Sequence, residues 1–474
     1  MSTISDNFYA RWRTRALPTA ALREGQDTPP EFLLQAIWQQ QRLLRDQLMT
    51  LDGETVRVLH PGFKNHEAGP DFRGAIVQIG AFARTGDVEI DLRAGGWRAH
   101  GHDRNPAFKQ VVLHVIWDGD RAVADGLPAM ALCGKLDAPL GELSSWLGQD
   151  SLKSLPESLM GKCCAPLREL PTESLTKLLF QAAQVRWAGK AHQFQARARQ
   201  VGWEQSLWEG LFRALGYKQN VWPMQRLAEL RPIYLSPPGD VLGCQARLFG
   251  LSGLLPAELT RAQGAGDNYL KRIWDQWWRE REQFSEAILP RELWRFNSLR
   301  PANHPQRRLA LAAHWLAAGN LVAKLENWFT TKIPDAELAN SLLEILQIER
   351  DDFWSWHWTF RSARLARAQP MLGAARVTDL AVNVILPWFW LRAVEGKNEK
   401  LQQEALHRFL AWPAAEDNSV LRLARQRLLG GAKSSALKGA AAQQGLLQII
   451  RDFCEHSNAI CENCTFPELA RDFV

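Results

Sequence analysis

Two carboxylates in the N-terminal part of the chain are spaced so that they could hold a divalent cation. Asp71 begins one apolar segment, and Glu89 lies within another, eighteen residues later. A tight turn near residues 80–86 would bring the two segments side by side as strands, with both carboxylates on one face. Carboxylate oxygens are the ligands that Mg²⁺ or Mn²⁺ prefers, and a cation held in this way can activate water and stabilise charge on a phosphoryl group.

The segment around Glu89 alternates between apolar and charged residues, which is typical of a strand. Its apolar positions are Val88, Ile90 and Leu92, and its charged positions are Asp87, Glu89, Asp91 and Arg93. Several carboxylates on one face repel each other unless a cation or basic side chains offset their charge. A solvent-exposed face of an antiparallel sheet explains the same pattern without a metal, and spacing alone does not separate the two interpretations.

Five of the eleven histidines fall in the same part of the sequence: His60, His66, His100, His102 and His114. On a strand, His100 and His102 would point the same way and could share a metal ion. We favour the alternative, in which they lie in a polar loop and hydrogen-bond to the carboxylates. One of the two is still expected to line the site, where it could contact a phosphate or carry a proton. His114, in an apolar strand, is expected to be a core histidine.

Near the C-terminus, Cys454, Cys461 and Cys464 have spacings that occur in metal sites. A Cys-x-x-Cys pair can supply two ligands from one turn to Zn²⁺ or to an iron–sulfur cluster. The fourth ligand would come from His456 or from a distant cysteine, and buried thiols are the alternative to a metal site. Seven cysteines in a chain without an export signal favour reduced thiols, so the expected localisation is cytoplasmic.

The elements that must position these residues follow from the hydrophobic pattern. Apolar residues at helical spacing predict a helix over residues 31–46. Strands are predicted over 54–59, 71–80, 86–93 and 111–117, with a weaker strand near 128–134 and a turn or short helix at 105–110. The expected fold class is therefore α+β, with a mixed sheet from about residue 55 to residue 134 and the first helix packed on it.

Three regions are expected along the chain. Residues 1–29 are polar and are predicted to be an N-terminal tail, and residues 30–145 carry the sheet and the candidate site. Residues 146–474 are predicted to form a large all-α domain that ends in the cysteine-containing segment. It would begin with a linker, because residues 135–170 are rich in Gly, Ser, Pro and Leu, whereas almost every segment beyond residue 171 has helical periodicity.

Composition limits the partners. The chain has 57 basic and 51 acidic side chains and a net charge of +6, which is compatible with nucleic acid as a partner but does not require one. No apolar run reaches the roughly 18 residues of a transmembrane helix, and the N-terminal residues lack the apolar core of a signal peptide, so no membrane association is expected. The sequence contains no phosphate-binding P-loop, no dinucleotide fingerprint and no nucleophile elbow.

The motifs Gly69-Pro70-Asp71-Phe72 and Glu89-Ile90-Asp91, within the predicted order of helices and strands, resemble the PD-(D/E)XK nuclease superfamily, which has the restriction-endonuclease-like fold. The resemblance implies that Asp71 and Glu89 bind a divalent ion and that a glutamate of the preceding helix, here Glu31, contributes. In that superfamily a lysine two residues after the glutamate assists the attacking water. Asp91 occupies that position here, so the cationic role would pass to Arg93, Lys64 or Lys109.

A second resemblance covers nearly the whole chain. The blocks are GPDF, GDVEI, HGHD, VVLHV, LGYKQN (215–220), RPANHPQRRLA (300–310) and NVILPW (383–388), followed by a cysteine-containing tail. They resemble a bacterial family of uncharacterised proteins, which usually has histidine where this chain has Asp91. That family has no established activity, so the resemblance adds context for the fold and little for the function.

Two functions are therefore carried forward. The first is a nuclease dependent on Mg²⁺ or Mn²⁺, with Asp71, Glu89, Asp91, His100, His102 and Glu31 around its active site. The second is a catalytically inactive nuclease-fold scaffold that acts as a binding or assembly module. Asp91 in the lysine position favours the scaffold, whereas the carboxylate pair and the histidine-rich loop favour the nuclease. A hydrolase acting on another substrate remains a third interpretation.

Overall fold

The computed structural model describes residues 7–16, 27–65, 68–119, 126–147, 165–217, 219–234, 239–260, 268–297, 299–416, 418–431, 437–455 and 465–473. The chain divides into two compact units. The first comprises Met1–Leu155 together with Arg451–Leu469, and the second comprises Pro156–Ile450 together with Ala470–Val474. The first unit therefore includes a C-terminal segment as well as the sheet that carries the candidate site.

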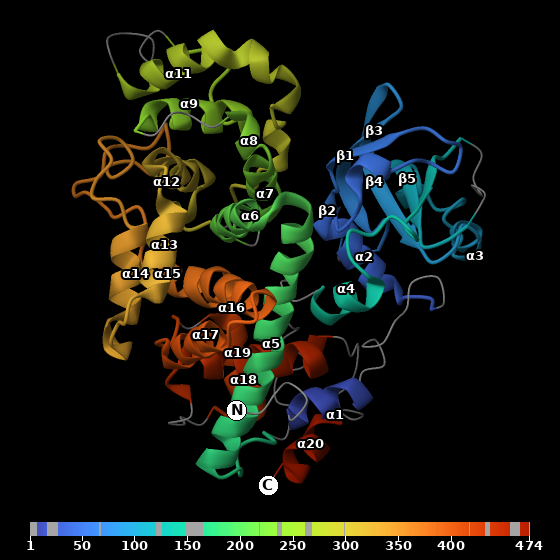
Figure 1. Ribbon diagram of the computed structural model, residues 1–474. Coiled ribbons are helices and arrows are strands. Elements are labelled where there is room, and N and C mark those ends of the chain that lie inside the picture. Colours follow the sequence, from blue (N-terminus) through green and yellow to red (C-terminus); the bar gives the residue numbers. More distant parts are fainter. Residues whose placement is uncertain are drawn as a thin grey trace. The chain divides into compact units, whose positions relative to one another are not determined.

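A six-stranded mixed sheet forms the body of the first unit (Figure 1). Its order is β1-β3-β4-β5-β6, and β2 pairs with β3 outside this path. β1, β3 and β4 are antiparallel to one another along this order, whereas β5 and β6 are added in parallel. The strands are β1 (Val56–His60), β2 (Phe63–Lys64), β3 (Phe72–Ile79), β4 (Phe82–Asp91), β5 (Val111–Ile116) and β6 (Ala129–Ala131). The α+β class predicted from the sequence is confirmed.

The β3–β4 hairpin brings the two predicted carboxylates to one place. Its turn has two residues, and Gly80 adopts φ of 57°, a conformation that favours glycine. Because Phe72 is paired with Val88, the residues flanking them, Asp71 and Glu89, lie at the same end of the hairpin. β4 ends at Asp91, two residues earlier than predicted, and its last four residues are all buried. The polar face of β4 is therefore covered and not solvent-exposed.

The first helix of the sheet domain is shorter than predicted. α2 (Glu31–Gln40) packs against β4 and ends where Gln41 adopts a left-handed conformation with φ of 50°. The prediction of helix to residue 46 is wrong, because Leu43 instead forms a bridge with Leu136 and is buried there. Tertiary pairing thus overrides a sequence that is compatible with further helix.

Two short helices lie where the sequence predicts a loop and a linker. α3 (Gly96–Ala99) follows directly on the end of β4, and α4 (Leu140–Trp146) follows the last strand. The two glycines before Trp97 resemble a turn signal, but Trp97 is buried and anchors α3 against the sheet domain. This helix matters because the histidines of the candidate site come immediately after it.

The predicted N-terminal tail contains a packed helix, α1 (Phe8–Ala16). Its Tyr9 is fully buried and donates a hydrogen bond of 2.8 Å to Asp452. Arg13 forms an ion pair of 2.9 Å with the same carboxylate, which belongs to a π-helical segment, η12 (Arg451–Glu455). Two segments far apart in the sequence, α1 and η12, therefore meet within the first unit.

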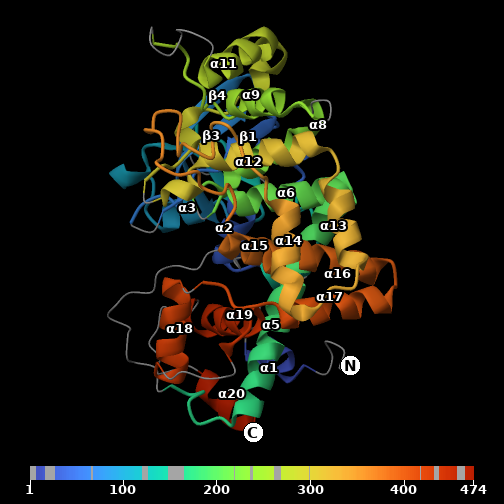
Figure 2. The same cartoon turned by 90° about the vertical axis from the view of Figure 1, so that its left-hand side faces the viewer.

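The second unit is helical, as predicted. Its long helix α5 packs against α6, α16 and α19, which surround it in Figure 2. A Cβ atom on Gly445 of α19 would lie 2.1 Å from the carbonyl oxygen of Leu179, so the two backbones touch there. The helices are α5 (Thr172–Val201), α6 (Trp203–Leu215), α7 (Val221–Glu229), α8 (Arg231–Tyr234), α9 (Val241–Leu251), α11 (Tyr269–Glu280), α12 (Pro305–Ala318), α13 (Leu321–Thr330), α14 (Leu338–Leu346), α15 (Ala374–Leu380), α16 (Leu386–Glu395), α17 (Glu399–Ala411), α18 (Ser419–Leu429) and α19 (Ala440–Ile450), with α20 (Phe466–Asp472) spanning the boundary between the units.

One helical run in the described part of the chain is long and apolar enough to cross a membrane, which the sequence analysis did not predict. It extends over Ala374–Glu395, from α15 through a π-helical stretch to α16, with a mean hydropathy of 1.3 in its most apolar window. Within the protein, 72% of that window is buried. Core helices of soluble proteins pass the same test of length and composition, so this run is weak evidence for a membrane span.

A buried arginine organises the longest irregular segment of the second unit, residues 347–373. Arg307 of α12 is fully buried, and its guanidinium donates hydrogen bonds to four backbone carbonyls of that segment. The acceptors are Trp354, His357, Gln369 and Pro370, at 2.5–3.2 Å. These bonds replace the backbone pairing that a helix or strand would supply, so the segment is ordered without regular secondary structure.

Replacing Arg307 by lysine should loosen this segment. Lysine keeps the charge but cannot direct donors to four carbonyls at once, so we expect a loss of about 2–3 kcal/mol of stability. Limited trypsin digestion reports on the segment because it contains Arg361, Arg364 and Arg367, and cleavage there should become much faster. The exposed Arg300→Lys serves as the control. Equal cleavage rates in both variants would contradict this account of the segment.

Candidate functional site

Asp71 and Glu89 are linked through the backbone of the β3–β4 hairpin. The amide of Asp71 donates a hydrogen bond of 3.0 Å to the Glu89 carboxylate, and the amide of Ile90 donates one of 3.2 Å to the Asp71 carboxylate. Each carboxylate therefore reaches across to the other strand. Glu89 is only 7% exposed, while Asp71, just before β3, is half-buried. The structure thus brings the predicted pair together.

Helix α2 brings a third carboxylate to this pair. Gln35 donates hydrogen bonds of 2.7 Å to Asp71 and 3.1 Å to Glu31, so one amide group bridges the two acids. Glu31 precedes Gln35 by one helical turn and lies on the same side of α2. Glu31 was a predicted site residue, whereas Gln35 was not. Its spacing from Glu31 is the signal that could have found it.

The acidic residues raise one another's pKa. Burial, reinforced by the neighbouring Asp71, raises the pKa of Glu89 to about 9. Burial and the charge of Glu31 raise the pKa of Asp71 to about 6. Partial burial and the charge of Asp91 raise the pKa of Glu31 as well. Without a cation, burial and mutual repulsion therefore favour the protonated, neutral forms of these acids, whereas a bound cation would favour their ionised forms.

Of the three basic residues predicted to replace the missing lysine, Lys64 is the one that acts on the carboxylates. It lies on β2, paired with Phe72 next to Asp71, and its charge lowers the pKa of both Asp71 and Glu31. Arg93 and Lys109 are exposed. The positive charge therefore comes from the strand beside Asp71 and not from β4.

Among the described residues, Asp91, His100 and His102 form a set that could hold a metal ion, because their ligand atoms all lie within 4.8 Å of one another. His100 Nδ1 is 3.1 Å from Asp91 Oδ1, and His102 Nε2 is 3.1 Å from Glu89 Oε1. The two histidines do not lie on a strand. They flank Gly101, which has φ of 72°, in the turn after α3. The set differs from the predicted ligands Asp71 and Glu89, although it includes three predicted site residues.

His114 is buried in β5, as predicted for a core histidine, but it also belongs to this site. Its Nε2 is 3.0 Å from Asp91 Oδ2, so Asp91 has one oxygen held by His114 and the other close to His100. Both side chains are 2% exposed. A partner of this kind fixes the orientation of a carboxylate and keeps one oxygen available to a cation. This pairing depends on a parallel strand contact that the sequence pattern did not reveal.

Aromatic side chains hold the His102 ring in place. It stacks on Phe108 with ring centroids 3.9 Å apart, and Trp97 meets it edge-on at 5.5 Å. Burial lowers the pKa of His102, so its neutral form is favoured. Both ring nitrogens are buried and make no hydrogen bond among the described residues, because Glu89 is close to Nε2 but not in line with it. A cation would supply the missing partner, so the chemistry of this ring fits a metal ligand.

The remaining predictions fall outside this cluster. His60 is buried, accepts a hydrogen bond from the amide of Gly62 and stacks near Phe63. His66 lies outside the described residues, as do Cys461 and Cys464. Cys454 is described, within η12. The proposed cysteine site for zinc or an iron–sulfur cluster therefore remains a prediction.

Substitution of one of two adjacent glycines should reveal how closely Asp91 is packed. A Cβ atom on Gly96 would lie 2.4 Å from Asp91 Oδ1, whereas one on Gly95 would meet no described atom within 4 Å. Gly96→Ala should therefore cost about 1–3 kcal/mol, and Gly95→Ala should be neutral or slightly stabilising. Thermal unfolding of both variants measures the difference. Similar melting temperatures would mean that Asp91 can move away.

The raised pKa of Glu89 predicts a pH-dependent gain from Glu89→Gln in the metal-free protein. Between pH 4.5, the ordinary pKa, and about 9, the unfolded chain binds fewer protons than the folded protein, so stability falls as pH rises. Glutamine removes this loss and can still accept the hydrogen bond from Asp71. We expect stabilisation of about 2–4 kcal/mol at pH 8 and little at pH 4. Chemical denaturation of the wild type and of Glu89→Gln at both pH values measures this difference, with Asp52→Asn in an exposed turn as the control. Destabilisation of Glu89→Gln at pH 8 would contradict the prediction.

Comparison with known proteins gives a family but no function. No curated protein matches the chain, and no solved structure matches it. One family, described as a protein of unknown function, matches residues 31–419. The matched region contains α2, the whole sheet, the candidate site and most of the helical unit. The resemblance to an uncharacterised family is thus confirmed, and this chain belongs to the family of proteins of unknown function designated DUF2851.

Proposed function

We propose that this protein is a divalent-metal-dependent phosphodiester hydrolase, a nuclease whose active site lies at the end of β4. The observation that carries the proposal is the convergence of acidic and imidazole ligands from separate elements. Glu31 comes from α2, Asp71 from the start of β3, Glu89 and Asp91 from β4, and the histidines from the turn after α3. A fold buries several acidic groups together only at a cost in stability, and sites of this kind are commonly functional.

The donor set supports Mn²⁺ or Zn²⁺ more than Mg²⁺. Asp91, His100 and His102 would hold the cation, with Glu89 beside His102 as a further oxygen ligand. Imidazole suits transition metals, whereas Mg²⁺ takes oxygen ligands and water. When bound, such a cation polarises a phosphoryl group and activates water. This assignment modifies the sequence prediction, in which Asp71 and Glu89 alone bind the metal.

The other residues would orient the substrate and the attacking water. Asp71 and Glu31, joined by Gln35, form an acceptor pair beside the cation ligands. Lys64 adds a positive charge next to Asp71, where it can stabilise negative charge on a phosphoryl group. That charge comes from β2, which is compatible with the migration of the lysine implied by the resemblance to PD-(D/E)XK nucleases.

The order of elements also supports the nuclease proposal. Apart from the two-residue β2 between β1 and β3, the main elements occur in the order helix α2, antiparallel strands β1, β3 and β4, short helix α3 and parallel strand β5. This is the order on which the resemblance to the PD-(D/E)XK superfamily rests. The scaffold alternative is favoured by one observation, the replacement of the usual lysine by Asp91, whose carboxylate is engaged by His114.

The test is cleavage of labelled DNA and RNA by the purified full chain with Mn²⁺, Zn²⁺, Mg²⁺ or EDTA. We expect activity with Mn²⁺ or Zn²⁺, and a loss of about 100-fold or more in His102→Gln and in Asp71→Asn. Asp52→Asn removes a carboxylate from an exposed turn of the same unit and should retain activity. Metal binding by the wild type without cleavage of either substrate would favour the scaffold.

A further inference from the structure

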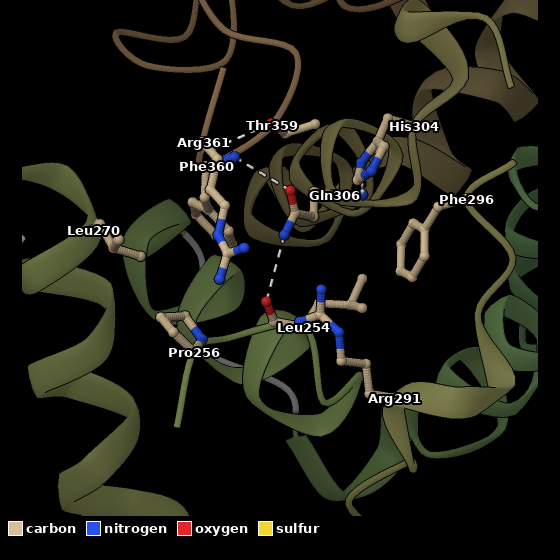
Figure 3. Close-up of a pocket in the computed structure, with 10 residues that line it drawn as sticks. All are labelled: Leu254, Pro256, Leu270, Arg291, Phe296, His304, Gln306, Thr359, Phe360 and Arg361. Atoms are coloured by element: carbon tan, nitrogen blue, oxygen red, sulfur yellow. Dashed lines mark hydrogen bonds between the residues drawn. The ribbon is translucent and has the colours of Figure 1, made fainter. Parts of the chain in front are cut away.

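A cavity lies in the helical unit, apart from the candidate cation site. It has a volume of about 150 Å³ and lies between the ends of α9, α11 and α12 and the irregular segment 347–373 (Figure 3). Its floor contains Leu254 and Leu270, which are buried. A space of this size accepts one aromatic ring or one small polar group, so it fits part of a larger ligand and not a whole cofactor.

The cavity is positively charged. Arg291 and Arg361 extend into it from opposite sides, and no described residue that lines it is acidic (Figure 3). Neither guanidinium makes an ion pair within the described parts of the chain, so their charge is available to a ligand. Burial, and then the charge of Arg291, lower the pKa of the neighbouring His304 to about 4, which leaves its ring neutral. An anionic group is the ligand that two guanidiniums recognise.

Flat rings form one side of the same cavity. Phe296 and His304 are stacked with ring centroids 5.4 Å apart and planes inclined by 21°, and the Arg291 guanidinium lies 5.6 Å from the Phe296 ring. Phe360 lies on the other side, beside Arg361 (Figure 3). Aromatic rings next to guanidiniums are suited to a ligand that has a planar ring and a negative charge.

One residue that lines the cavity, Arg361, belongs to a basic segment of the chain. Arg361, Arg364 and Arg367 are all exposed, and no acidic residue occurs between Phe353 and Gln369. The Trp356 ring lies within 4.8 Å of the Arg350 guanidinium and 4.3 Å of the Arg364 guanidinium. The four carbonyl bonds of Arg307 fix the backbone that carries these arginines. The chain on both sides of these arginines is therefore held in place before a ligand binds.

We infer that this surface binds single-stranded nucleic acid and that the cavity takes one base of it. The base would lie against Phe296 and His304, with its phosphate held by Arg291 and Arg361, and the adjoining phosphates would follow the exposed Arg364 and Arg367. A duplex keeps its bases paired and stacked, so only a single strand can present a base to a space of this size. The site lies in the helical unit and is separate from the proposed cation site, although it addresses the same class of substrate.

Binding can be measured without cleavage, which separates this inference from the proposed nuclease activity. The assay is fluorescence anisotropy of a short labelled single strand in EDTA, over a series of salt concentrations. We expect Arg291→Gln with Arg361→Gln to weaken binding about 10-fold or more, and to reduce the slope of log K against log salt by about 0.7 for each phosphate that the protein no longer neutralises. Phe296→Leu should weaken binding without changing that slope, because it removes stacking and no charge.

Arg300→Gln is the matched control, since it removes an exposed arginine that does not line the cavity. It should bind like the wild type, and trypsin resistance of segment 347–373 verifies that each variant remains folded. Equal binding of a duplex, or equal losses in Arg300→Gln and the cavity variants, would overturn the inference in favour of general attraction to polyanions. Unchanged affinity in Phe296→Leu would show that no base stacks in the cavity, and would overturn that part of the inference. If the protein binds the single strand but cleaves neither DNA nor RNA, this inference stands and the nuclease proposal fails.

Discussion

The candidate site depends on the fixed position of one buried carboxylate, that of Asp91. It is held by the imidazole of His114 from the neighbouring parallel strand, approached by His100 from the following turn, and packed against the backbone of Gly96. Each contact comes from a different part of the chain. The end of β4, the start of α3 and the interior of β5 must therefore be in register before the site exists. Without Asp91 in this orientation, His100 and His102 would not form a set of possible metal ligands with it.

Around Asp91 the protein accumulates charge that contributes nothing to stability in the absence of a cation. Glu31, Asp71 and Glu89 all have raised pKa values, and a raised pKa for an acid means that its ionised form is disfavoured in the folded protein. A purely structural sheet would be better served by apolar residues at the same positions. This imbalance is the physical reason to regard the end of β4 as a site, and it applies equally to a catalyst and to a metal-binding scaffold.

The sequence predicted those parts of the site that depend on residues close together in the chain, and missed those that depend on distant residues. The alternation around Glu89 and the spacing from Asp71 are local, and they correctly indicated two strands with facing carboxylates. The end of α2 at Gln41 was mispredicted because it depends on a distant bridge between Leu43 and Leu136. The partnership of His114 with Asp91 depends on parallel pairing across a crossover, and no periodicity encodes it. The bridging role of Gln35 likewise appears only when α2 packs against the sheet and comes close to Asp71.

The same reasoning applies to the helical unit. Helical periodicity indicated most of its helices, but the cavity is built from segments more than a hundred residues apart, such as Leu254 and Phe360. Of its two arginines, Arg291 begins a single turn of 3-10 helix and Arg361 lies in the irregular segment 347–373, whose order comes from Arg307, a residue within a helix that precedes it. Sequence patterns identify elements well when the interaction partner is a few residues away. They cannot identify a binding surface whose parts converge only through tertiary packing.

The order of the two units along the chain determines what happens when the chain is cut between them. Because the first unit contains both Met1–Leu155 and Arg451–Leu469, the helical unit is inserted into it, and the chain passes between the units at two internal points before it returns to the second unit near its end. Asp452, after the insertion, holds Tyr9 and Arg13, before it. A single cut between the units would therefore leave their fragments tethered through folded contacts. An isolated N-terminal fragment, in contrast, would expose a tyrosine that the intact protein buries completely, so the sheet unit is a discontinuous domain whose closing segment is synthesised only after the helical insertion.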